Sequence, residues 1–234
     1  MAIYALSDVH GELELWRQIQ NFLTKDDTLI FLGDAIDRGK EGITILKEML
    51  LDDRVIYLLG NHETNLLYAL RNEDDREFLY DWFQDGGLPT WVEFSLLPFE
   101  EQNSLCKEIS RLPLHITYIN KNKKRIDLSH SGYTPEEKED FEYTYSQKIE
   151  KYICNRKHLE EKWVDNKNID YIIHGHTPTG CIDTSAMGQI YHYCDNHKIN
   201  IDTGAAFLGV AALLDLDTLA PIYFYKKKII KGDL

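Results

Sequence analysis

Short apolar runs recur along the chain, and each ends at polar residues. Runs rich in Ile, Leu, Val and Tyr are typical of strands, and a run that is apolar at nearly every position indicates a strand with both faces covered. The runs that we interpret as strands are residues 2–6, 28–32, 54–59, 125–129, 170–174 and 198–202. Between the first three lie helix-like segments at 13–23 and 42–51. This order predicts a β-α-β-α-β start with parallel strands and right-handed crossovers.

Less regular patterns occupy the rest of the chain. Residues 65–72 and 76–84 have helical spacing, whereas the sequence DGGLPTW at 85–91 indicates a loop. The charged, tyrosine-bearing span 134–165 predicts mostly helical structure. The final stretch, 205–225, predicts antiparallel strands that close a second sheet.

The length and charge of the chain limit the classes of protein to which it can belong. A chain of 234 residues fits one sizeable domain, and we expect a single α/β domain over residues 1–234. The net charge of -13 argues against a DNA- or RNA-binding surface, which needs a basic face, although local cations can still bind one phosphate group. We interpret the short basic runs at 121–125 and 226–232 as a solvated turn and a solvated tail.

Neither a membrane nor an oxidising compartment is indicated by the sequence. There is no secretory signal at the start of the chain and no apolar run of about 18 residues. The four cysteines form no Cys-x-x-Cys pair, which argues against zinc-ribbon and thioredoxin-like sites and suggests reduced, packed thiols. We therefore expect a cytoplasmic protein without membrane or nucleic-acid partners.

Polar side chains follow five of the predicted strands. Ligand sites in α/β sheets lie just beyond the carboxyl ends of strands, where a buried carboxylate needs a partner or a metal ion. These residues are Asp8 and His10 after the first strand, Asp34, Asp37 and Arg38 after the second, Asn61, His62 and Glu63 after the third, His130 after the fourth and His176 after the fifth. Their convergence predicts one site at one edge of the sheets.

The donor types at these strand ends suggest a metal centre. Carboxylate, imidazole and amide donors without thiolates suit Mn²⁺, Fe or Zn²⁺ better than Ca²⁺. Six candidate ligands are too many for one catalytic ion with an open position, so they suit two ions with one carboxylate between them. Two-ion sites activate water and serve in-line displacement at phosphorus. Singly, Asn61 could be a turn residue and His130 an ordinary core histidine; the ordered set predicts the site.

Five motifs together resemble those of the binuclear, calcineurin-like metallophosphoesterases, and within them the phosphoprotein phosphatases. They are DVHG (8–11), GDAIDRG (33–39), GNHE (60–63), SHSG (129–132) and GHTP (175–178). CNRKHL (154–159) and IDTGAAFLG (201–209) resemble the bacterial and phage branch that includes lambda phosphatase. The resemblance runs from residue 3 to about residue 215 and is loose over 66–125. It implies an α/β fold in which two mixed β-sheets pack as a central sandwich flanked by helices.

The resemblance also implies ligands for two divalent ions, with Mn²⁺ the expected metal. The first ion would be held by Asp8, His10 and Asp34, and the second by Asp34, Asn61, His130 and His176. Many relatives read Gly-His-x-His, but Pro178 stands at that place here, so the first ion is expected to have only three protein ligands.

Catalytic and phosphate-binding roles follow from the same resemblance. His62 would be the general acid and Asp37 its orienting partner, since an aspartate beside a histidine stabilises the imidazolium. The groups expected to bind the phosphate are Arg38, Arg156 and Asn61, and a planar guanidinium matches two phosphate oxygens. Arg156 could instead be an exposed arginine on a charged helix. Asp202 could orient a ligand histidine or stabilise a turn.

The leading functional hypothesis is a metal-dependent serine/threonine protein phosphatase acting on phosphorylated proteins or peptides. The closest alternative is a symmetrical diadenosine tetraphosphate hydrolase, whose members tend to read Gly-Asn-His-Asp and to lack the aspartate at position 37. Glu63 and Asp37 therefore favour the phosphatase. A nucleotide or small-molecule phosphatase remains open. A non-catalytic scaffold is a further alternative, but it would be expected to have lost a ligand or the acid.

Overall fold

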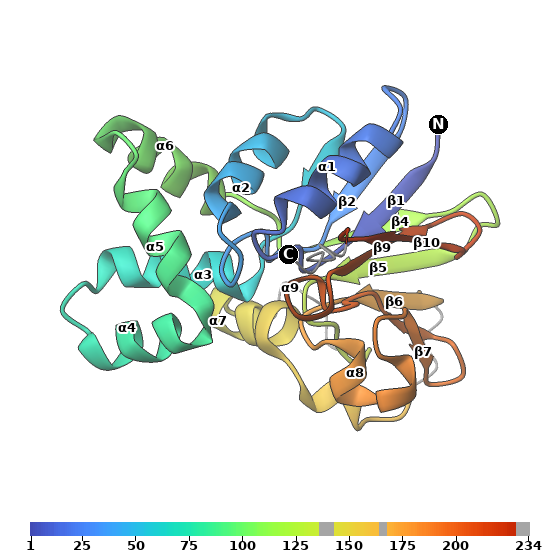
Figure 1. The fold of residues 1–234 in the computed structure, drawn as a ribbon. Helices are drawn as coiled ribbons and strands as arrows, with labels where there is room; N and C mark the ends of the chain where they lie inside the picture. The colour runs from blue at the N-terminus through green and yellow to red at the C-terminus, as the bar shows by residue number, and fades with distance from the viewer. Residues whose placement is uncertain (136–142, 164–167, 228–234) are drawn as a thin grey trace, which may run out of the picture.

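Two five-stranded mixed β-sheets form the centre of the computed structural model, which describes residues 1–135, 143–163 and 168–227 (Figure 1). The first sheet has the order β10 (Pro221–Tyr225), β9 (Val210–Asp215), β1 (Ile3–Leu6), β2 (Thr28–Phe31) and β3 (Val55–Tyr57). The second has the order β4 (His115–Ile119), β5 (Arg125–Ser129), β6 (Tyr171–His174), β8 (Lys198–Asn200) and β7 (Tyr191–Tyr193).

The apolar runs are continuous because both faces of the first sheet are covered. Along β2 and just beyond it, Leu29 and Phe31 belong to the apolar cluster on the helical side, whereas Ile30 and Leu32 belong to the cluster between the sheets. Side chains of a strand alternate between faces, so an apolar residue is needed at each position. The layer between the sheets contains Ala5, Ile30, Leu32, Leu58, Ile126, Leu128, Ile173, Ile199, Ile201, Leu214 and Leu216, all buried.

Parallel pairing brings the functional strand ends to a common edge. β1, β2 and β3 are parallel to one another, as are β5, β6 and β8. The residues that follow each strand therefore leave each sheet at the same edge. The two sheets stack face to face, and the loops from both edges meet, as the contacts between Asp34 and His130 described below demonstrate.

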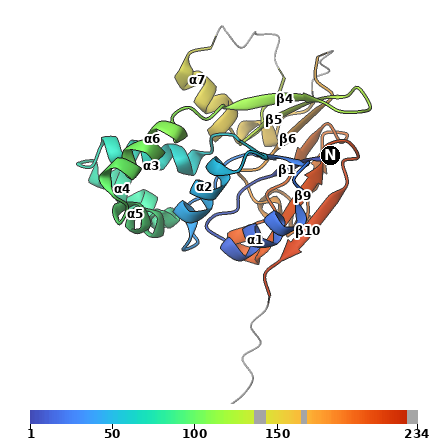
Figure 2. The same ribbon diagram turned by 90° about the horizontal axis from the view of Figure 1, so that it is seen from above.

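Helices cover the outside of the first sheet and form a separate group at one side of the molecule (Figures 1 and 2). The buried Trp16 and Ile19 of α1 (Leu13–Phe22) and Leu46 of α2 (Gly42–Leu51) pack in the same cluster as the outer face of that sheet. The helices of the lateral group are α3 (Asn61–Arg71), α4 (Arg76–Trp82), α5 (Leu88–Ser95) and α6 (Phe99–Ile109).

Short helices complete the described part of the chain. They are α7 (Tyr145–Ile149), α8 (Thr179–Ile182) and α9 (Ala205–Leu208), with π-helical turns at Phe83–Gly87 and Glu150–Cys154 and 3₁₀ turns at Lys157–Leu159 and Thr184–Ala186. Within the residues described, no helix combines the length and the apolar character required to cross a bilayer.

The α/β fold with two mixed sheets is confirmed, and each of the six predicted strands is present. The helices predicted at 13–23, 42–51, 65–72 and 76–84 are present as well. The sequence pattern missed β4 and β7, which are the edge strands of the second sheet, and helix α6. The burial of β4 follows no simple alternation, which explains why its pattern is weak.

The loop predicted at 85–91 is wrong. Residues 85–87 belong to the π-helical turn Phe83–Gly87, and residues 88–91 form the first half of α5. The glycines and the proline that indicated a loop are accommodated in helical structure. Gly86 forms a kink with φ 101°, and Pro89 lies in the first turn of α5, where its missing N–H has no helical acceptor to lose.

The C-terminal strands are antiparallel as predicted, but they join the first sheet and not the second. β9 pairs with β10 and with β1, so that Ala5 faces Leu214. β1 pairs with β2 on one side only, and β9 satisfies the backbone groups on its other side. The residues at 205–208 form α9 before the hairpin begins. A hairpin pattern encodes the pairing of its own two strands and contains no information on which sheet edge it joins.

Within the predicted helical span 134–165, helical structure is present over 145–154 and in the 3₁₀ turn at 157–159. Residues 134–135, 143–144, 155–156 and 160–163 are not helical, and 136–142 and 164–165 lie outside the described residues. The basic run at 121–125 begins in the turn between β4 and β5, as expected, and continues to the first residue of β5. Of the predicted basic tail, residues 228–232 lie outside the described part.

Candidate metal centre

The loops after the strands have an unusual backbone conformation. A non-glycine residue with positive φ is uncommon and costs on the order of 1–3 kcal/mol, so it persists only where its surroundings impose it. Six predicted site residues adopt this conformation, namely Asp8 (54°), His10 (46°), Asp34 (65°), Asp37 (70°), Arg38 (65°) and His176 (70°). Strain of this kind is often found at functional sites. Outside the site, positive φ also occurs in turns, as at Cys194, Asp195 and Asn196, so it supports the site only together with the contacts below.

Close backbone contact joins the loops after β2 and β3. A Cβ atom built on Gly33, whose φ is 100°, would lie 2.6 Å from the Cα atom of Gly60. Only a residue without a side chain fits between these two segments. The contact places Asp34 beside Asn61 and His62 at the start of α3.

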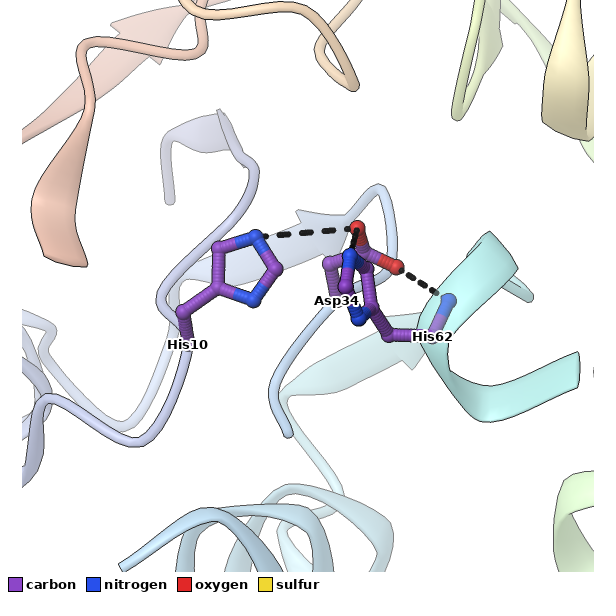
Figure 3. A group of neighbouring side chains, drawn as sticks. All are labelled: His10, Asp34 and His62. Carbon is purple, nitrogen blue, oxygen red and sulfur yellow. Dashed lines mark hydrogen bonds and ion pairs between the residues drawn. The ribbon is translucent and has the colours of Figure 1, made fainter. Parts of the chain in front are cut away.

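The carboxylate of Asp34 is the centre of the site. Its Oδ1 atom accepts a hydrogen bond from the backbone N–H of His62 (3.0 Å). Its Oδ2 atom lies 3.7 Å from Nε2 of His10, 3.7 Å from Nε2 of His62 and 3.3 Å from Nε2 of His130. Figure 3 shows the dashed contacts from Asp34 to His10 on one side and to His62 on the other.

Electrostatics keep Asp34 ionised although it is only 1% exposed. Burial alone would raise the pKa of its carboxyl, but the imidazoles of His130, His62 and His10 lower that pKa well below its ordinary value. A buried carboxylate held in the charged form by surrounding donors is suited to binding a cation from more than one side.

Four donor atoms converge in the group predicted to hold the second ion. Oδ1 of Asn61 lies 2.9 Å from Nε2 of His130 and 2.8 Å from Nδ1 of His176. The fourth donor is Oδ2 of Asp34, at 3.3 Å from Nε2 of His130. Ligands bound at about 2.0–2.2 Å to one ion lie roughly 3 Å or more apart, so these spacings fit a shared ion.

The donor atoms predicted to hold the first ion lie farther apart than those predicted to hold the second. Nε2 of His10 lies 3.8 Å from Oδ1 of Asp8 and 3.7 Å from Oδ2 of Asp34. The Nδ1 atom of His10 contacts the carbonyl oxygen of Ile36 (2.8 Å), which leaves Nε2 to face the carboxylates. Ser7 Oγ and the backbone N–H of His176 both donate to Oδ2 of Asp8, so Oδ1 is the free oxygen.

Unsatisfied buried groups provide a test of whether a cation fits here. Among the described residues, Oδ1 of Asp8, Nε2 of His176 and Oδ2 of Asp202 are buried without a hydrogen-bond partner. Burial, with the neighbouring carboxylates, raises the pKa of Asp8 and raises that of Asp202 well above its ordinary value. Burial lowers the pKa of His176 to about 2, so its imidazole is neutral. Its lone pair can then be on Nδ1, the atom that faces Oδ1 of Asn61, and the unpartnered Nε2 is not the proposed donor. Excess buried negative charge and free lone pairs fit bound divalent ions.

His62 forms a buried pair with Asp37. The Nδ1 atom of His62 lies 2.5 Å from Oδ2 of Asp37, which also accepts from Nε1 of Trp82 (2.7 Å). Thr90 Oγ1 accepts the backbone N–H of Asp37 at 2.8 Å. Burial alone would lower the pKa of His62, but the carboxylates of Asp34 and Asp37 outweigh it and raise that pKa. The pair therefore favours a protonated imidazole.

By distance alone, His62 also belongs to a group that could hold a metal, together with His10 and Asp34. Its Nε2 atom is as far from Oδ2 of Asp34 as that of His10. The sequence assigned His62 a role as acid rather than ligand, so metal content in a His62 variant separates the two roles.

The two predicted phosphate-binding arginines differ in their surroundings. Arg38 lies in the site: its Nη1 contacts Nε2 of His10 and its Nη2 lies 3.1 Å from Nε2 of His62. Arg156 is exposed and donates from Nε to Oγ1 of Thr177 (3.3 Å), next to His176 in the chain. Its positive charge contributes to the low pKa of His176, which indicates proximity to the site.

Asp85 is a site neighbour that the sequence did not single out, whereas Glu63 was expected at the site but without a specific role. Oδ1 of Asp85 lies 3.6 Å from Nη2 of Arg38, and its Oδ2 lies 3.7 Å from Nε2 of His62. The π-helical turn that contains Asp85 was predicted as a loop. π-helical turns are frequent at functional sites, but no sequence pattern here predicted one.

Glu63 ties the loops after β2 and β3 together. Its carboxylate accepts the backbone N–H groups of Asp34 (2.9 Å), Ala35 (2.9 Å) and Gly60 (3.1 Å), and the hydroxyl of Tyr57 (3.0 Å). Burial and the charge of Asp34 raise its pKa to about 7. Its position three residues into α3 is the signal that could have found it, because a glutamate there often caps the helix start.

The fold and the donor set together define a hydrolase class that binds divalent metal ions beyond the carboxyl ends of parallel strands. This chain belongs to the calcineurin-like phosphoesterase family, whose sequence profile matches residues 1–180. The family expected from the motifs is therefore confirmed. Its members depend on two metal ions.

Named relatives differ in substrate. The chain is 30% identical to Serine/threonine-protein phosphatase 2 of Escherichia coli (strain K12), over 88% of this chain and 89% of that protein. It is 26% identical to the symmetrical Bis(5'-nucleosyl)-tetraphosphatase of Buchnera aphidicola subsp. Schizaphis graminum, over 73% of this chain and 59% of that protein. Its fold is similar to that of a protein serine/threonine phosphatase from Saccharomyces cerevisiae, with a TM-score of 0.58, 13% identity and coverage of 99% and 82%.

Replacing Glu63 should weaken both the fold and metal binding. In Glu63→Gln, one carboxylate oxygen becomes an amide donor that faces backbone N–H groups, so at least one buried N–H loses its acceptor. We expect the free energy of unfolding, measured with urea, to fall by about 1–3 kcal/mol. We also expect weaker Mn²⁺ binding in calorimetry, because the loops of Asp34 and Asn61 lose their common anchor.

Glu93→Gln is the matched control. Glu93 accepts the backbone N–H groups of Ile43 (2.9 Å) and Thr44 (3.0 Å) at the start of α2, and it contacts none of the proposed ligands. The Glu93→Gln variant should have a lower free energy of unfolding but an unchanged affinity for Mn²⁺. Equal losses of affinity in both variants would show that Glu63 has no specific role in the metal centre.

Proposed function

We propose that the protein is a metal-dependent serine/threonine protein phosphatase that hydrolyses phosphoserine or phosphothreonine in proteins. The observation that carries the proposal is the buried His62–Asp37 pair facing the guanidinium of Arg38. It joins a group suited to protonating a basic alkoxide to a group suited to binding a phosphate. We further propose that the chain acts as one domain, because loops from both sheets supply the site.

Two divalent ions, with Mn²⁺ as the proposed metal, would be held by two sets of ligands that share Asp34. Asp8, His10 and Asp34 would bind the first ion, and Asp34, Asn61, His130 and His176 the second. Bound in this way, the ions would activate water and neutralise charge on the phosphoryl oxygens. Asp202 accepts the backbone N–H of Gly204 through Oδ1, and the charge of Asp8 contributes to its raised pKa, so it would add negative charge near the first set.

Side chains of the protein would protonate the leaving group and bind the phosphate. Water attacks phosphorus, the bond from phosphorus to the serine or threonine oxygen breaks, and Nε2 of His62 gives its proton to that oxygen. The products are inorganic phosphate and a free hydroxyl group. Asp37 holds the imidazole through Nδ1 and stabilises its charged form. Arg38, Arg156 and the amide of Asn61 would bind the phosphoryl oxygens, since charged donors form the stronger hydrogen bonds.

Hydrolysis of dinucleoside tetraphosphates is the second candidate, and the named Buchnera relative is what favours it. A phosphate monoester presents three terminal oxygens, which two arginines and two ions can surround. An internal anhydride has bulk on both sides of the attacked phosphorus and a leaving group that departs readily without a proton. The acid pair would therefore contribute little to that reaction, so we favour the phosphatase.

Removing the shared ligand should disturb both ions. In Asp34→Asn, both sets lose a charged oxygen, so metal analysis should find less than one ion per chain. Asp8→Asn should lose mainly one ion, because Asp8 belongs to one set. Hydrolysis of p-nitrophenyl phosphate by the unaltered protein should be abolished by chelation and restored by Mn²⁺. For the Asp34→Asn variant, metal analysis that still finds two bound ions per chain would refute the assignment of Asp34 as the shared ligand.

His62→Asn should separate chemistry from metal binding. We expect kcat for a phosphoserine peptide to fall by about 10²–10⁴-fold, the usual contribution of a positioned acid. The fall should be smaller for p-nitrophenyl phosphate, whose leaving group needs no proton. Metal content should stay unchanged. Loss of an ion would make His62 a ligand, and equal losses with both substrates would exclude the acid role.

A direct comparison of substrates tests the proposed function. With Mn²⁺ present, kcat/KM for phosphoserine or phosphothreonine peptides should exceed that for diadenosine tetraphosphate. Arg156→Ala should cost the peptide reaction about 1.5–3 kcal/mol of transition-state stabilisation, the range for a hydrogen bond to a charged group. If the dinucleotide is the better substrate, the phosphatase assignment is wrong and the second candidate replaces it.

A further inference from the structure

The exposed aromatic side chain of Phe207, from the C-terminal part of the chain, lies against Arg38. The guanidinium carbon of Arg38 is 5.1 Å from the centre of the Phe207 ring, although the two residues are far apart in the sequence. At this distance the charge interacts favourably with the face of the ring. The ring therefore holds the guanidinium from outside, while the Nη atoms of Arg38 contact His10 and His62.

Phe207 lies in a short helical turn that leaves its side chain exposed. α9 is a single turn between Gly204 (φ 79°) and Gly209 (φ 67°), and both glycines are in the left-handed region. The neighbouring Leu208 lies against Gly204, where a Cβ atom would meet it at 3.5 Å. Both large apolar side chains of the turn are exposed, Leu208 at 46% and Phe207 at 66%, but only Phe207 has its ring against Arg38.

Single exposed apolar side chains are ordinary on protein surfaces and usually need no explanation. Phe207 differs because its ring is in contact with a phosphate-binding candidate and not merely with solvent. The ring lies against the guanidinium of Arg38, whose side chain is 20% exposed, and most of the Phe207 side chain remains open to solvent. A group attached to a phosphate bound by Arg38 would therefore lie near that open surface.

We propose that Phe207 is a positioning and specificity-determining residue, which orients Arg38 toward the phosphate and selects phosphopeptides with an apolar side chain beside the phosphorylated residue. The inference rests on the proposed phosphatase function. The ring centre is 5.1 Å from the guanidinium proposed to bind the phosphate, and one extended residue spans about 3.3–3.6 Å, so a side chain one or two residues from the phosphorylated one would come near the ring. Contact with an apolar side chain there would remove both surfaces from water.

The positioning role is tested by the affinity of the Mn²⁺-loaded protein for inorganic phosphate, measured by calorimetry. Phe207→Ala should bind phosphate about 2- to 5-fold more weakly, as expected for loss of an exposed cation–π contact. Phe207→Tyr keeps an aromatic face and should restore the affinity. Phe99→Ala is the matched control, since Phe99 is 76% exposed on α6 and belongs to the lateral helices. Unchanged phosphate affinity in Phe207→Ala would overturn this role.

The specificity role is tested with two phosphoserine peptides that differ only in leucine or glycine next to the phosphoserine. The unaltered protein and Phe99→Ala should prefer the leucine peptide by roughly 10-fold in kcat/KM, the lower range for one apolar contact. Phe207→Ala should lose this preference, and Phe207→Tyr should retain it. A preference that is absent in the unaltered protein, or that persists in Phe207→Ala, would overturn the role.

Failure of the inference about Phe207 can be distinguished from failure of the proposed function. If the unaltered protein hydrolyses phosphopeptides without a flanking preference, the inference about Phe207 fails and the proposed function stands. If it hydrolyses diadenosine tetraphosphate but no phosphopeptide, the proposed function fails, and peptide selection by Phe207 fails with it. The phosphate affinities still decide whether Phe207 orients Arg38.

Discussion

The structure depends above all on one buried negative charge, the carboxylate of Asp34. It is almost fully excluded from water, and a carboxylate in that position destabilises a fold unless other groups compensate it. The compensation comes from both sheets: His10 approaches from the loop after β1, His62 from the start of α3 after β3, and His130 from the loop after β5 in the second sheet. The requirement to satisfy this charge therefore couples the stacking of the sheets to the assembly of the site.

The surrounding backbone is organised around the same requirement. Site loops accept left-handed conformations at non-glycine residues, and the strain is offset by contacts that leave no alternative. Gly33 and Gly60 touch because neither has a side chain, and the carboxylate of Glu63 receives backbone N–H groups from both segments. Glu63 thus connects the two segments that contain proposed ligands, whereas Glu93 accepts backbone N–H groups in the same way at the start of α2 and contacts none of the proposed ligands.

Much of the fold was predictable, since its central strands are apolar on both faces and their pattern is strong. The failures have specific causes. The stretch 85–91 contains glycine and proline, which indicate a loop in isolation, but helical packing accommodates Gly86 as a kink and Pro89 in a first turn. The final hairpin was recognised but assigned to the wrong sheet, because pairing with β1 depends on an open backbone edge and not on the hairpin's own residues.

For the site, the sequence by itself determined which donor groups follow which strands, because parallel strands end at one edge and the motifs name the residues there. Spatial relations were decided only by the tertiary structure. It brings His62 as close to Asp34 as His10 is, sets Asp85 beside Arg38, and lays Phe207 on Arg38 from the far end of the chain. Such contacts join segments that have no pattern in common, and they exist only once both sheets and the C-terminal strands have packed together.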